Sequence, residues 1–360
     1  MTHIAVWIYP QCMASPVTAP LDVFAIANAI WIAQGQAKEQ RQPLFSWSIH
    51  SADGAAVKTP TGVVLQVDGD FSSNITNNIA NDIQADVLML PGIFLGNGMQ
   101  DLWRTLDELR PYFPLLREKH AQGSLLVSNC SASFVFAEAG LLDHGHATTA
   151  WWLERVFKAR YPQVELRLGE VLDEYRDIVT SGAASAYMNL ALDIVRRFAG
   201  PEVTASVAKT MLIDANRATQ TPYMNLSGMT QQESQSHADD LVIRAQKWLR
   251  QHRHLAFRLP ALADYLAVSE RTVIRHFHQA LGTTPASYAQ LLKIDLAKRL
   301  METTTLTLDE VAERTGYTDL SSFRRLFKRH TSLSPAAYRE QFKPQKSVAA
   351  ATTTTAATTT

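Results

Sequence analysis

The chain has 360 residues, of which 46% are hydrophobic, and its 34 Lys and Arg residues are balanced by 34 Asp and Glu residues. This length favours two domains, and the hydrophobic content is ample for buried cores. The only two cysteines, Cys12 and Cys130, exclude a disulfide framework and suit a reducing cytoplasm. We find no apolar run of about 18 residues and no signal-peptide pattern, so we predict a cytoplasmic protein without a membrane-spanning segment.

The first 200 residues alternate short apolar runs with helical segments. Strands are predicted at residues 4–8, 44–50, 86–90, 125–127 and 178–182, and helices at 20–34, about 106–116, 131–139 and 184–198. Strands that are apolar throughout are buried on both faces, and their alternation with helices is typical of a parallel sheet. The pattern therefore predicts an α/β domain with a doubly wound sheet.

One of these strands leads directly into a cysteine. Residues 125–129 read Leu-Leu-Val-Ser-Asn, Cys130 follows, and the next helix is predicted over 131–139. Such a turn exposes a thiol at the carboxyl edge of the sheet, where backbone amides stabilise an anion, as in a nucleophile elbow. The pattern makes Cys130 the candidate functional residue of this domain.

This half of the chain resembles the glutamine-amidotransferase-like superfamily that includes the PfpI-type proteases. Besides the Cys130 turn, the resemblance rests on several short stretches that are specific only together: Pro-Leu-Asp-Val-Phe at 20–24, Leu-Pro-Gly at 90–92, Gly-Leu-Leu at 140–142, Ala-Thr-Thr at 147–149 and Thr-Ser-Gly at 180–182. The resemblance implies a flavodoxin-like, glutamine-amidotransferase-like fold.

The catalytic histidine of that superfamily is missing. Its enzymes place a histidine in a Thr-Thr-His-Trp-like stretch roughly twenty residues after the cysteine, where it holds the thiolate and shuttles protons. This chain has Thr-Thr-Ala-Trp at residues 148–151, so Ala150 takes the place of the histidine. We therefore predict that the domain is not an enzyme, and that the neighbouring His144 and His146 are solvated side chains.

Three interpretations of Cys130 stay open. Asp22 falls where related proteins keep an acid near the thiol, so the two form a ligand-reading or redox-sensitive pair, line a pocket, or are purely structural. The candidate sensor pocket consists of Asp22, Gly92, Cys130 and Ser131. The sequence lacks the GxxxxGK[ST], CxxC and HExxH motifs, so we predict no cofactor and no metal.

The domain organisation is read from composition. The predicted segments are an amidotransferase-like domain at 1–200, a helix and polar linker at 201–240, a helical domain at 241–343, and a disordered tail of mostly Ala and Thr at 344–360. The helical domain has 17 Lys and Arg against 9 Asp and Glu, a net charge of +8, so the rest of the neutral chain carries −8. A basic helical domain is typical of binding to a phosphate backbone.

The helical domain contains the same motif twice, about 50 residues apart. The first copy spans residues 259–285 and the second 308–338. Each reads as a short helix, a tight turn and a second helix that pairs buried aromatics with arginine, which is typical of a helix-turn-helix. Thr307 and Glu310 form a capping box, Ser269 caps the second helix of the first copy, and a long helix over 285–301 separates the copies.

Residues 240–340 resemble the DNA-binding domain of the AraC family of transcription regulators. The matching residues are Ser269, Arg271, Arg275, Phe277, Gly316, Tyr317, Phe323, Arg325, Phe327, Lys328, Pro335, Tyr338 and Arg339. The chain departs from the family at Ser332, where the family usually has glycine and where we expect a different backbone angle.

By this resemblance, two sets of residues contact DNA. The predicted set is Arg271, Ile274 and Arg275 in the first copy and Leu320, Ser321, Ser322 and Arg325 in the second, with Lys328 on the phosphate backbone. The chemistry suits these roles, because arginine pairs bidentately with guanine and an exposed Ile or Leu packs on a thymine methyl group.

These features predict a sequence-specific transcription regulator that binds double-stranded promoter or operator DNA. Its N-terminal domain is expected to sense an unknown small-molecule effector or to form a homodimer, and RNA polymerase is a further expected partner. The alternative is a cysteine-dependent amidase or hydrolase that carries a DNA-binding domain. Ala150, at the position of the catalytic histidine, argues against this alternative. A third interpretation makes the N-terminal domain a dimerisation scaffold only.

Overall fold

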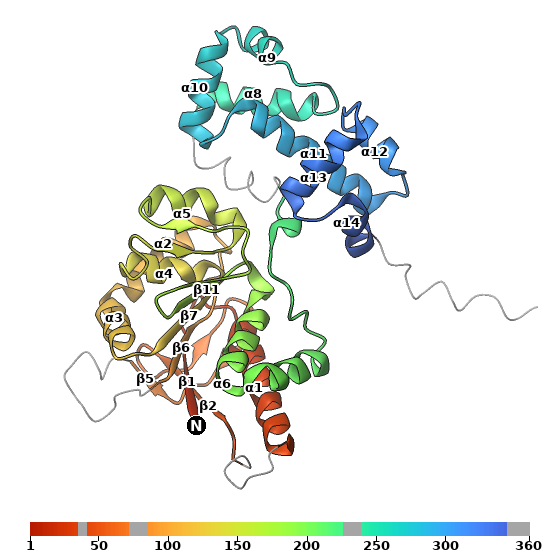
Figure 1. The fold of residues 1–360 in the computed structure, drawn as a ribbon. Coiled ribbons are helices and arrows are strands. Elements are labelled where there is room, and N and C mark those ends of the chain that lie inside the picture. The colour runs from red at the N-terminus through yellow and green to blue at the C-terminus, as the bar shows by residue number, and fades with distance from the viewer. Residues whose placement is uncertain (35–41, 72–84, 226–238, 344–360) are drawn as a thin grey trace, which may run out of the picture. The chain divides into compact units, whose positions relative to one another are not determined.

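The computed structural model describes residues 1–34, 42–71, 85–225 and 239–343. The chain divides into two compact units, Met1–Thr221 and Pro222–Thr360 (Figure 1). The first unit extends beyond the predicted boundary at residue 200, because Val171 N donates to Ala218 O and Gln220 N donates to Gly169 O. Most of the predicted polar linker and the predicted tail lie outside the described residues.

The first unit is built on a seven-stranded sheet. In sheet order the strands are β10 (Leu172–Tyr175), β11 (Ile178–Ser181), β7 (Leu125–Asn129), β6 (Val87–Leu90), β1 (Thr2–Trp7), β2 (Phe45–Ser51) and β5 (Gly69–Asp70). Every pairing is parallel except that of β10 with β11. Leaving out β5 and β10 at the edges, the strands follow the order 2-1-3-4-5, which is that of flavodoxin-like folds. The predicted doubly wound sheet is confirmed.

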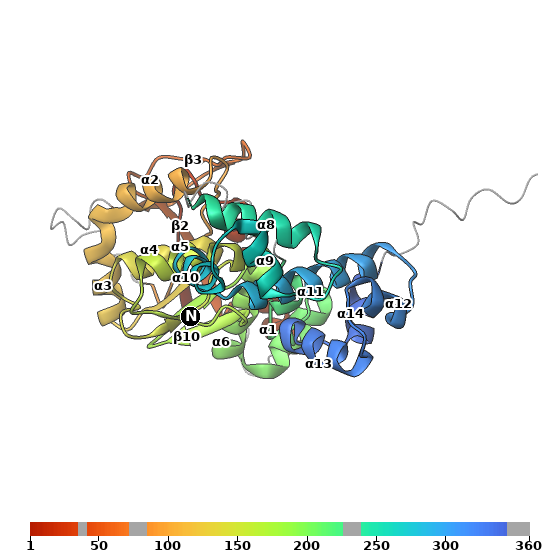
Figure 2. The same ribbon diagram turned by 90° about the horizontal axis from the view of Figure 1, so that it is seen from above.

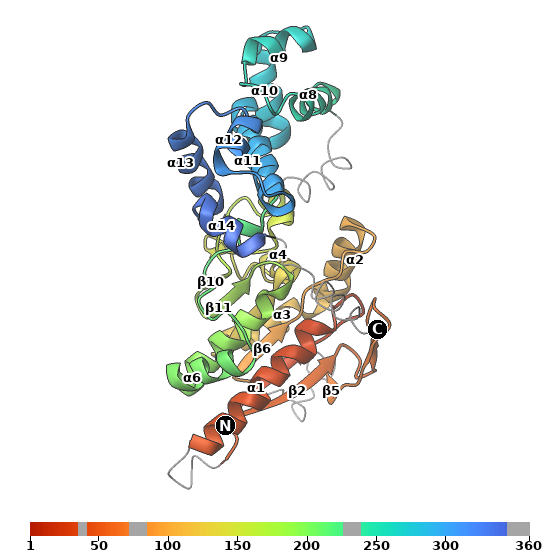
Figure 3. The same cartoon turned by 90° about the vertical axis from the view of Figure 1, so that its right-hand side faces the viewer.

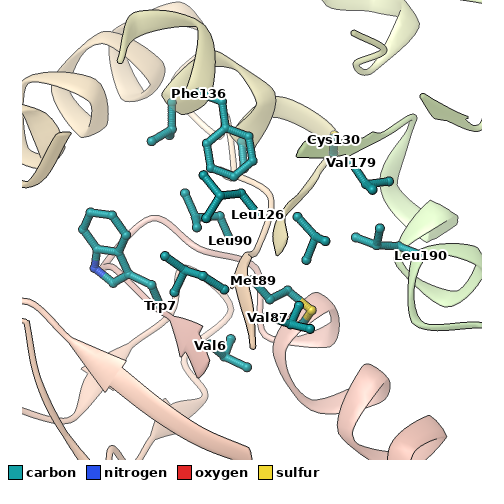
Figure 4. Close-up of a cluster of buried hydrophobic side chains, with 14 of the residues drawn as sticks. Val6, Trp7, Val87, Met89, Leu90, Leu126, Cys130, Phe136, Val179 and Leu190 are labelled. Atoms are coloured by element: carbon teal, nitrogen blue, oxygen red, sulfur yellow. The ribbon is translucent and has the colours of Figure 1, made fainter. Parts of the chain in front are cut away.

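The sheet is buried on both faces. All four residues of β6 and all five of β7 are buried, as expected for parallel strands that are covered by helices on each side. Figure 4 shows side chains from β1, β6 and β7, among them Val6, Val87 and Leu126, packed in one apolar cluster. This cluster anchors the strand ends at which the candidate pocket was predicted.

The helices of the first unit differ from the predicted ones at their ends. They are α1 (Ser15–Gln34), α2 (Met99–Leu109), α3 (Phe113–Ala121), α4 (Ser133–Glu138), α5 (Glu154–Arg160) and α6 (Tyr187–Thr210). The single helix predicted around 106–116 is two helices, because a 3-10 turn at Arg110–Tyr112 contains Pro111, whose ring is incompatible with a helix interior. Helix α6 is kinked at Gly200, where φ is 81°. Short strand pairs that the sequence did not predict are β3 (Val57–Lys58) with β4 (Val64–Leu65) and β8 (His146–Ala147) with β9 (Glu165–Leu166).

Helix α1 is long and apolar enough to cross a membrane by length and composition alone. In the structure it packs beside α6 and against the sheet (Figure 3). Val17, Val23 and Phe24 on this helix are fully buried, and the ring of Phe24 lies 5.4 Å from that of Phe45 in β2. The apolar composition of α1 is thus explained by its place in the core of this unit.

The described part of the second unit is helical. Its helices are α8 (Asp240–Gln251), α9 (Leu259–Leu266), α10 (Glu270–Leu281), α11 (Pro285–Thr303), α12 (Leu308–Arg314), α13 (Leu320–Thr331) and α14 (Pro335–Phe342). Figure 2 shows α8, α9 and α10 grouped around one part of α11, and α12, α13 and α14 around the other. Helix α11 contributes Tyr288 and Leu292 to the first apolar core and Ile294 and Met301 to the second. The two predicted helix-turn-helix copies are therefore two cores that share one helix.

The helix caps predicted from the sequence are present. Ser269 Oγ accepts a hydrogen bond from Thr272 N at 3.2 Å, and it begins α10. Thr307 Oγ1 accepts from Glu310 N, while Thr307 N donates to the Glu310 carboxylate at 2.6 Å, which completes the capping box of α12. Such caps fix where each short helix begins.

The expectation for Ser332 is wrong. Ser332 ends α13 at φ 59° and ψ 0°, and Gly282 ends α10 at φ 64° and ψ 13°. Serine therefore adopts the same left-handed conformation as glycine, and the turn is not rebuilt. Because a side chain in this region costs roughly 1–2 kcal/mol, the second copy tolerates a strained residue that the first copy avoids.

Candidate functional site

The two exposed helices α10 and α13 are equivalent in sequence position and in burial. Residues 271–280 and 321–330 show the same order of buried, half-buried and exposed side chains, so each residue of the first range matches the residue 50 positions later. Val273 and Phe277 are fully buried in α10, as are Phe323 and Phe327 in α13. Since each helix is fixed by one apolar stripe, the opposite face is free to contact a partner.

The predicted DNA-contacting residues fall mainly on these free faces. Those that are exposed are Arg271, Ile274, Arg275, Ser321, Arg325 and Lys328. Ser322 is half-buried, and so is Leu320, which packs against the core of the second copy. Leu320 thus offers less apolar surface to DNA than Ile274, which is 41% exposed.

One residue of this surface was missed by the sequence reasoning. Arg324 is exposed and lies 50 residues after Ile274, so it occupies the equivalent position on α13. The offset that relates Arg275 to Arg325 was the signal that would have identified it. Arg324 adds a cation to a helix face that already contains Arg325 and Lys328.

A carboxylate caps the start of α13. Asp319 accepts hydrogen bonds from Ser321 N at 3.0 Å and Ser322 N at 2.8 Å. The hydrogen bonds from Ser322 and Ser321 lower the pKa of Asp319, which keeps this carboxyl ionised. The cap orients the first turn of the helix, which contains two of the predicted base-contacting serines.

The two copies are joined by a close backbone contact. Lys293 in α11 is buried, and its Nζ donates to Gly316 O at 3.2 Å and lies 5.1 Å from the ring of Tyr317. A Cβ atom on Gly316 would lie 2.5 Å from His254 O. Gly316 therefore permits the turn between α12 and α13 to touch the loop that follows α8, and Lys293 fastens it there.

This arrangement suits recognition of a DNA major groove. Two short helices with arginines on their free faces belong to one basic unit and are held by the shared helix α11. Arginine reads guanine bidentately, and lysine neutralises phosphate charge. The described residues contain no group of three or more metal-ligating side chains.

The predicted turn at Cys130 in the first unit has the strained geometry of an elbow. Cys130 follows β7 directly with φ 56°, and a 3-10 turn over Cys130–Ala132 leads into α4. Its carbonyl oxygen accepts from Ser133 Oγ and Thr149 Oγ1, both at 3.0 Å. A left-handed cysteine at this place is held by its surroundings and marks a constrained site.

The prediction of an exposed thiol is wrong: the Cys130 side chain is buried and its thiol is neutral. Burial raises the pKa of Cys130 to about 11, although hydrogen bonds from Ser131 and from the backbone of Ala184 oppose this rise. Cys12, which follows β1, pairs its backbone with that of Ile93, which follows β6. Burial raises the pKa of Cys12 to about 11 as well. The hydroxyl of Tyr9 donates to Pro91 O, and its pKa is also raised by burial. The buried side chains at these strand ends are thus uncharged at neutral pH.

Three of the four predicted pocket residues lie together. A Cβ on Gly92 would lie 3.3 Å from Cys130 Cβ, and Ser131 Oγ exchanges hydrogen bonds with Ile93 N at 2.9 Å and Ile93 O at 2.8 Å. Asp22 is exposed on α1, and it is not among the groups that shift the pKa of Cys130. The geometry gives no support to an Asp22–Cys130 pair.

The neighbouring histidines have other surroundings. His144 is exposed, whereas His146 Nδ1 lies 2.7 Å from Asp173 Oδ2 and its ring packs on Tyr175. Ala150 is fully buried and follows Thr149, whose hydroxyl is bonded to Cys130 O. Residue 150 thus offers no group that exchanges a proton with the thiol.

Because the Cys130 thiol is protonated at neutral pH, we expect native protein to react with iodoacetamide at pH 8 on the order of 100-fold more slowly at Cys130 than a free cysteine does. The rate should rise as the pH approaches 11. Mass spectrometry of the Cys130 peptide over time measures it, and the same protein in denaturant is the control. A native rate equal to the denatured rate would show an accessible thiolate and contradict this geometry.

Comparison with known proteins finds relatives over most of the chain. A helix-turn-helix domain family matches residues 262–341. The HTH-type transcriptional regulator CdhR of Pseudomonas aeruginosa is 25% identical over 307 residues, which cover 85% of this chain and 85% of that protein. The HTH-type transcriptional regulator GbdR of Pseudomonas aeruginosa is 23% identical over 335 residues, 92% of this chain and 84% of that protein. An AraC family transcriptional regulator structure from Pseudomonas putida covers 59% of this chain and 100% of its own, with a TM-score of 0.43 and 19% identity.

Proposed function

We infer that this chain, a DNA-binding transcriptional regulator of the AraC type with a PfpI-like N-terminal domain, reads DNA with the free faces of α10 and α13. The observation that carries this inference is the repeated burial pattern at a constant offset of 50 residues, which leaves Arg275 and Arg325 exposed at equivalent positions. A single chain thus presents two recognition helices, each suited to a stretch of major groove.

The proposed contacts divide by chemistry. Arg271, Arg275 and Arg325 donate to guanine, Ile274 packs on a thymine methyl group, and Ser321 and Ser322 hydrogen-bond to base edges. Lys328 pairs with phosphate, and we add Arg324 as a further cation on α13. Leu320 contributes less than the sequence suggested, because it packs partly into the core.

The first unit acts in this proposal as a non-catalytic sensor. Its strand ends at Gly92, Cys130 and Ser131 form the candidate sensing region, and a small-molecule effector is the proposed signal. We also propose that the protein works in the cytoplasm, forms a homodimer and contacts RNA polymerase. The burial and raised pKa of Cys130 favour a structural or effector-sensing role over an oxidation switch, because a redox sensor needs an accessible thiolate.

The alternative, a cysteine-dependent amidase or hydrolase with a DNA-binding domain, has less support. Such an enzyme needs a base beside its nucleophile, and the residue after Thr149 is alanine. The relatives over most of the chain are transcriptional regulators. Hydrolysis of an amide or ester by wild type and its loss in Cys130→Ser would restore this alternative.

The full-length protein is expected to bind duplex DNA with an affinity that falls steeply with salt, because counterions leave the phosphates. Lys328→Ala should weaken cognate and random DNA alike and reduce the slope of log K against log salt by about 1. Fluorescence anisotropy at several salt concentrations measures both effects. Lys158→Ala removes the same charge from α5 of the other unit and is the matched control. Failure of wild type to bind any duplex at low salt would overturn the proposal.

A further inference from the structure

A short segment of the chain, Pro222–Asn225, is bound by the second helix-turn-helix copy. Lys298 Nζ in α11 donates to Pro222 O at 3.1 Å and to Met224 O at 2.6 Å. Gln341 Nε2 in α14 donates to Tyr223 Oη at 2.9 Å, and the ring of Tyr223 lies 5.1 Å from that of Phe342. Backbone and side-chain contacts thus hold this segment in a groove between α11 and α14.

The groove is built around a buried cation. Lys298 is only 6% exposed, and burial lowers its pKa to about 8, against the opposing effect of Asp295 and Glu302. Its Nζ also lies 5.6 Å from the ring of Tyr338, whose hydroxyl donates to Glu302. A buried ammonium is costly unless its donors are satisfied, and two of its acceptors are carbonyls of the segment. The groove therefore fits this segment chemically, and DNA recognition by α13 does not account for it.

The residues just before the segment are fixed in the first unit. Gln220 is 4% exposed, and its Nε2 donates to Leu168 O at 2.8 Å and Thr149 O at 2.9 Å. Its Oε1 accepts from Ala183 N at 3.0 Å. A Cβ on Gly182 would lie 2.7 Å from Gln220 Oε1, so glycine makes room for this side chain. Only Thr221 therefore separates Gln220, which is fixed in the first unit, from Pro222, which is bound by the second unit.

We propose that the groove between α11 and α14 is a docking surface for Pro222–Asn225, and that this docking couples the N-terminal unit to the second helix-turn-helix copy. The coupling rests on the proposed function in DNA binding, whereas the docking does not. Thr149 bonds to both Cys130 O and Gln220, so a rearrangement of the Cys130 turn changes the anchor that precedes the segment. Displacement of Gln220 then strains the hydrogen bonds between Lys298 and the segment.

The docking is tested in the full chain by proteolysis. Chymotrypsin cleavage after Tyr223, followed by mass spectrometry, should be at least about 10-fold faster in Lys298→Met, which keeps the packed stem and removes the ammonium. Lys247→Met removes the same charge from an exposed position of α8, outside this groove, and should be cleaved at the wild-type rate. Equal rates in wild type and Lys298→Met would overturn the docking.

The coupling is tested by lengthening the chain between Gln220 and Pro222 without substituting either residue. Two glycines inserted between Thr221 and Pro222 should change DNA affinity by about 2- to 30-fold, and Lys298→Met should change it by the same factor. The combined variant should show no further change, because both alterations break one connection. Additive effects, or no effect of either change on DNA affinity, would overturn the coupling. If wild type binds no DNA, the proposed function fails, while the cleavage rates still decide the docking.

Discussion

Replacing Arg275 by alanine in the full chain is expected to weaken binding to a cognate DNA site by about 1–3 kcal/mol, roughly 5- to 150-fold, and Arg325→Ala by a similar amount. The physical reason is the loss of a bidentate contact to one base pair, so discrimination at that base pair should relax as well. Within the described part of the chain neither guanidinium forms an ion pair: Arg325 Nη2 is 3.5 Å from Ser322 Oγ, and Arg275 Nη2 is 3.4 Å from His276 Nε2.

Selection of a binding site from random duplexes, followed by anisotropy on that site and its single-base variants, measures both effects. Arg244→Ala is the control, because Arg244 is exposed on α8 and lies on neither recognition helix. Since the two arginines belong to different helices, the double variant should lose roughly the sum of the two single losses. Wild-type affinity and specificity in either single variant would show that its helix does not read bases.

Gly316→Ala is expected to destabilise the second unit by roughly 2–5 kcal/mol. Part of this cost, about 1–2 kcal/mol, comes from a side chain at φ 72°. The remainder, about 1–3 kcal/mol, comes from overpacking, because the new Cβ would lie 2.5 Å from the carbonyl oxygen of His254. The contact joins the two helix-turn-helix copies, so DNA affinity should fall together with stability.

Gly282→Ala separates these two causes. Gly282 has φ 64°, but a Cβ placed there meets no atom within 4 Å, so only the backbone cost of about 1–2 kcal/mol is expected. Hydrogen exchange of peptides from 259–342 in the full-length variants reports the local free energy of opening. Equal destabilisation by both substitutions would mean that the contact between Gly316 and His254 contributes nothing.

The elements with strong local patterns were predictable. The spacing of Val273 with Phe277 and of Phe323 with Phe327 identified the buried stripe of each recognition helix, and all four side chains are fully buried. Capping needs only residues three positions apart, which is why the Thr307–Glu310 box was predicted correctly. The apolar strands likewise identified the α/β class of the first unit, since burial on both faces leaves no alternation.

The burial of particular polar groups was decided by segments that are distant in sequence. Lys293 and Lys298 are ordinary lysines in the sequence, yet the carbonyls of Gly316 and of Pro222 and Met224 bring both ammonium groups into the interior. For the same reason the first unit ends at Thr221 and not at the predicted residue 200. Gln220 forms its hydrogen bonds with residues 149, 168 and 183. The periodicity of a sequence identifies the apolar face of a helix or strand. It contains no information on which carbonyl group, distant in sequence, will bind a polar side chain of that element.

The Cys130 turn shows both sides of this division. A strand followed by cysteine and a helix predicted an elbow-like turn, and the structure adds that its backbone is left-handed, with φ 56° at Cys130. Whether the thiol is reactive depends instead on the packing of three strand ends, where Tyr9, Cys12 and Ile93 are buried with it. Sequence alone therefore determined two helix-turn-helix copies and a sheet with a cysteine at its edge. Only the tertiary structure decided that this thiol is neutral, that Asp22 is exposed on α1, and that the connecting segment is held by Lys298, because desolvation and hydrogen bonding depend on three-dimensional neighbours.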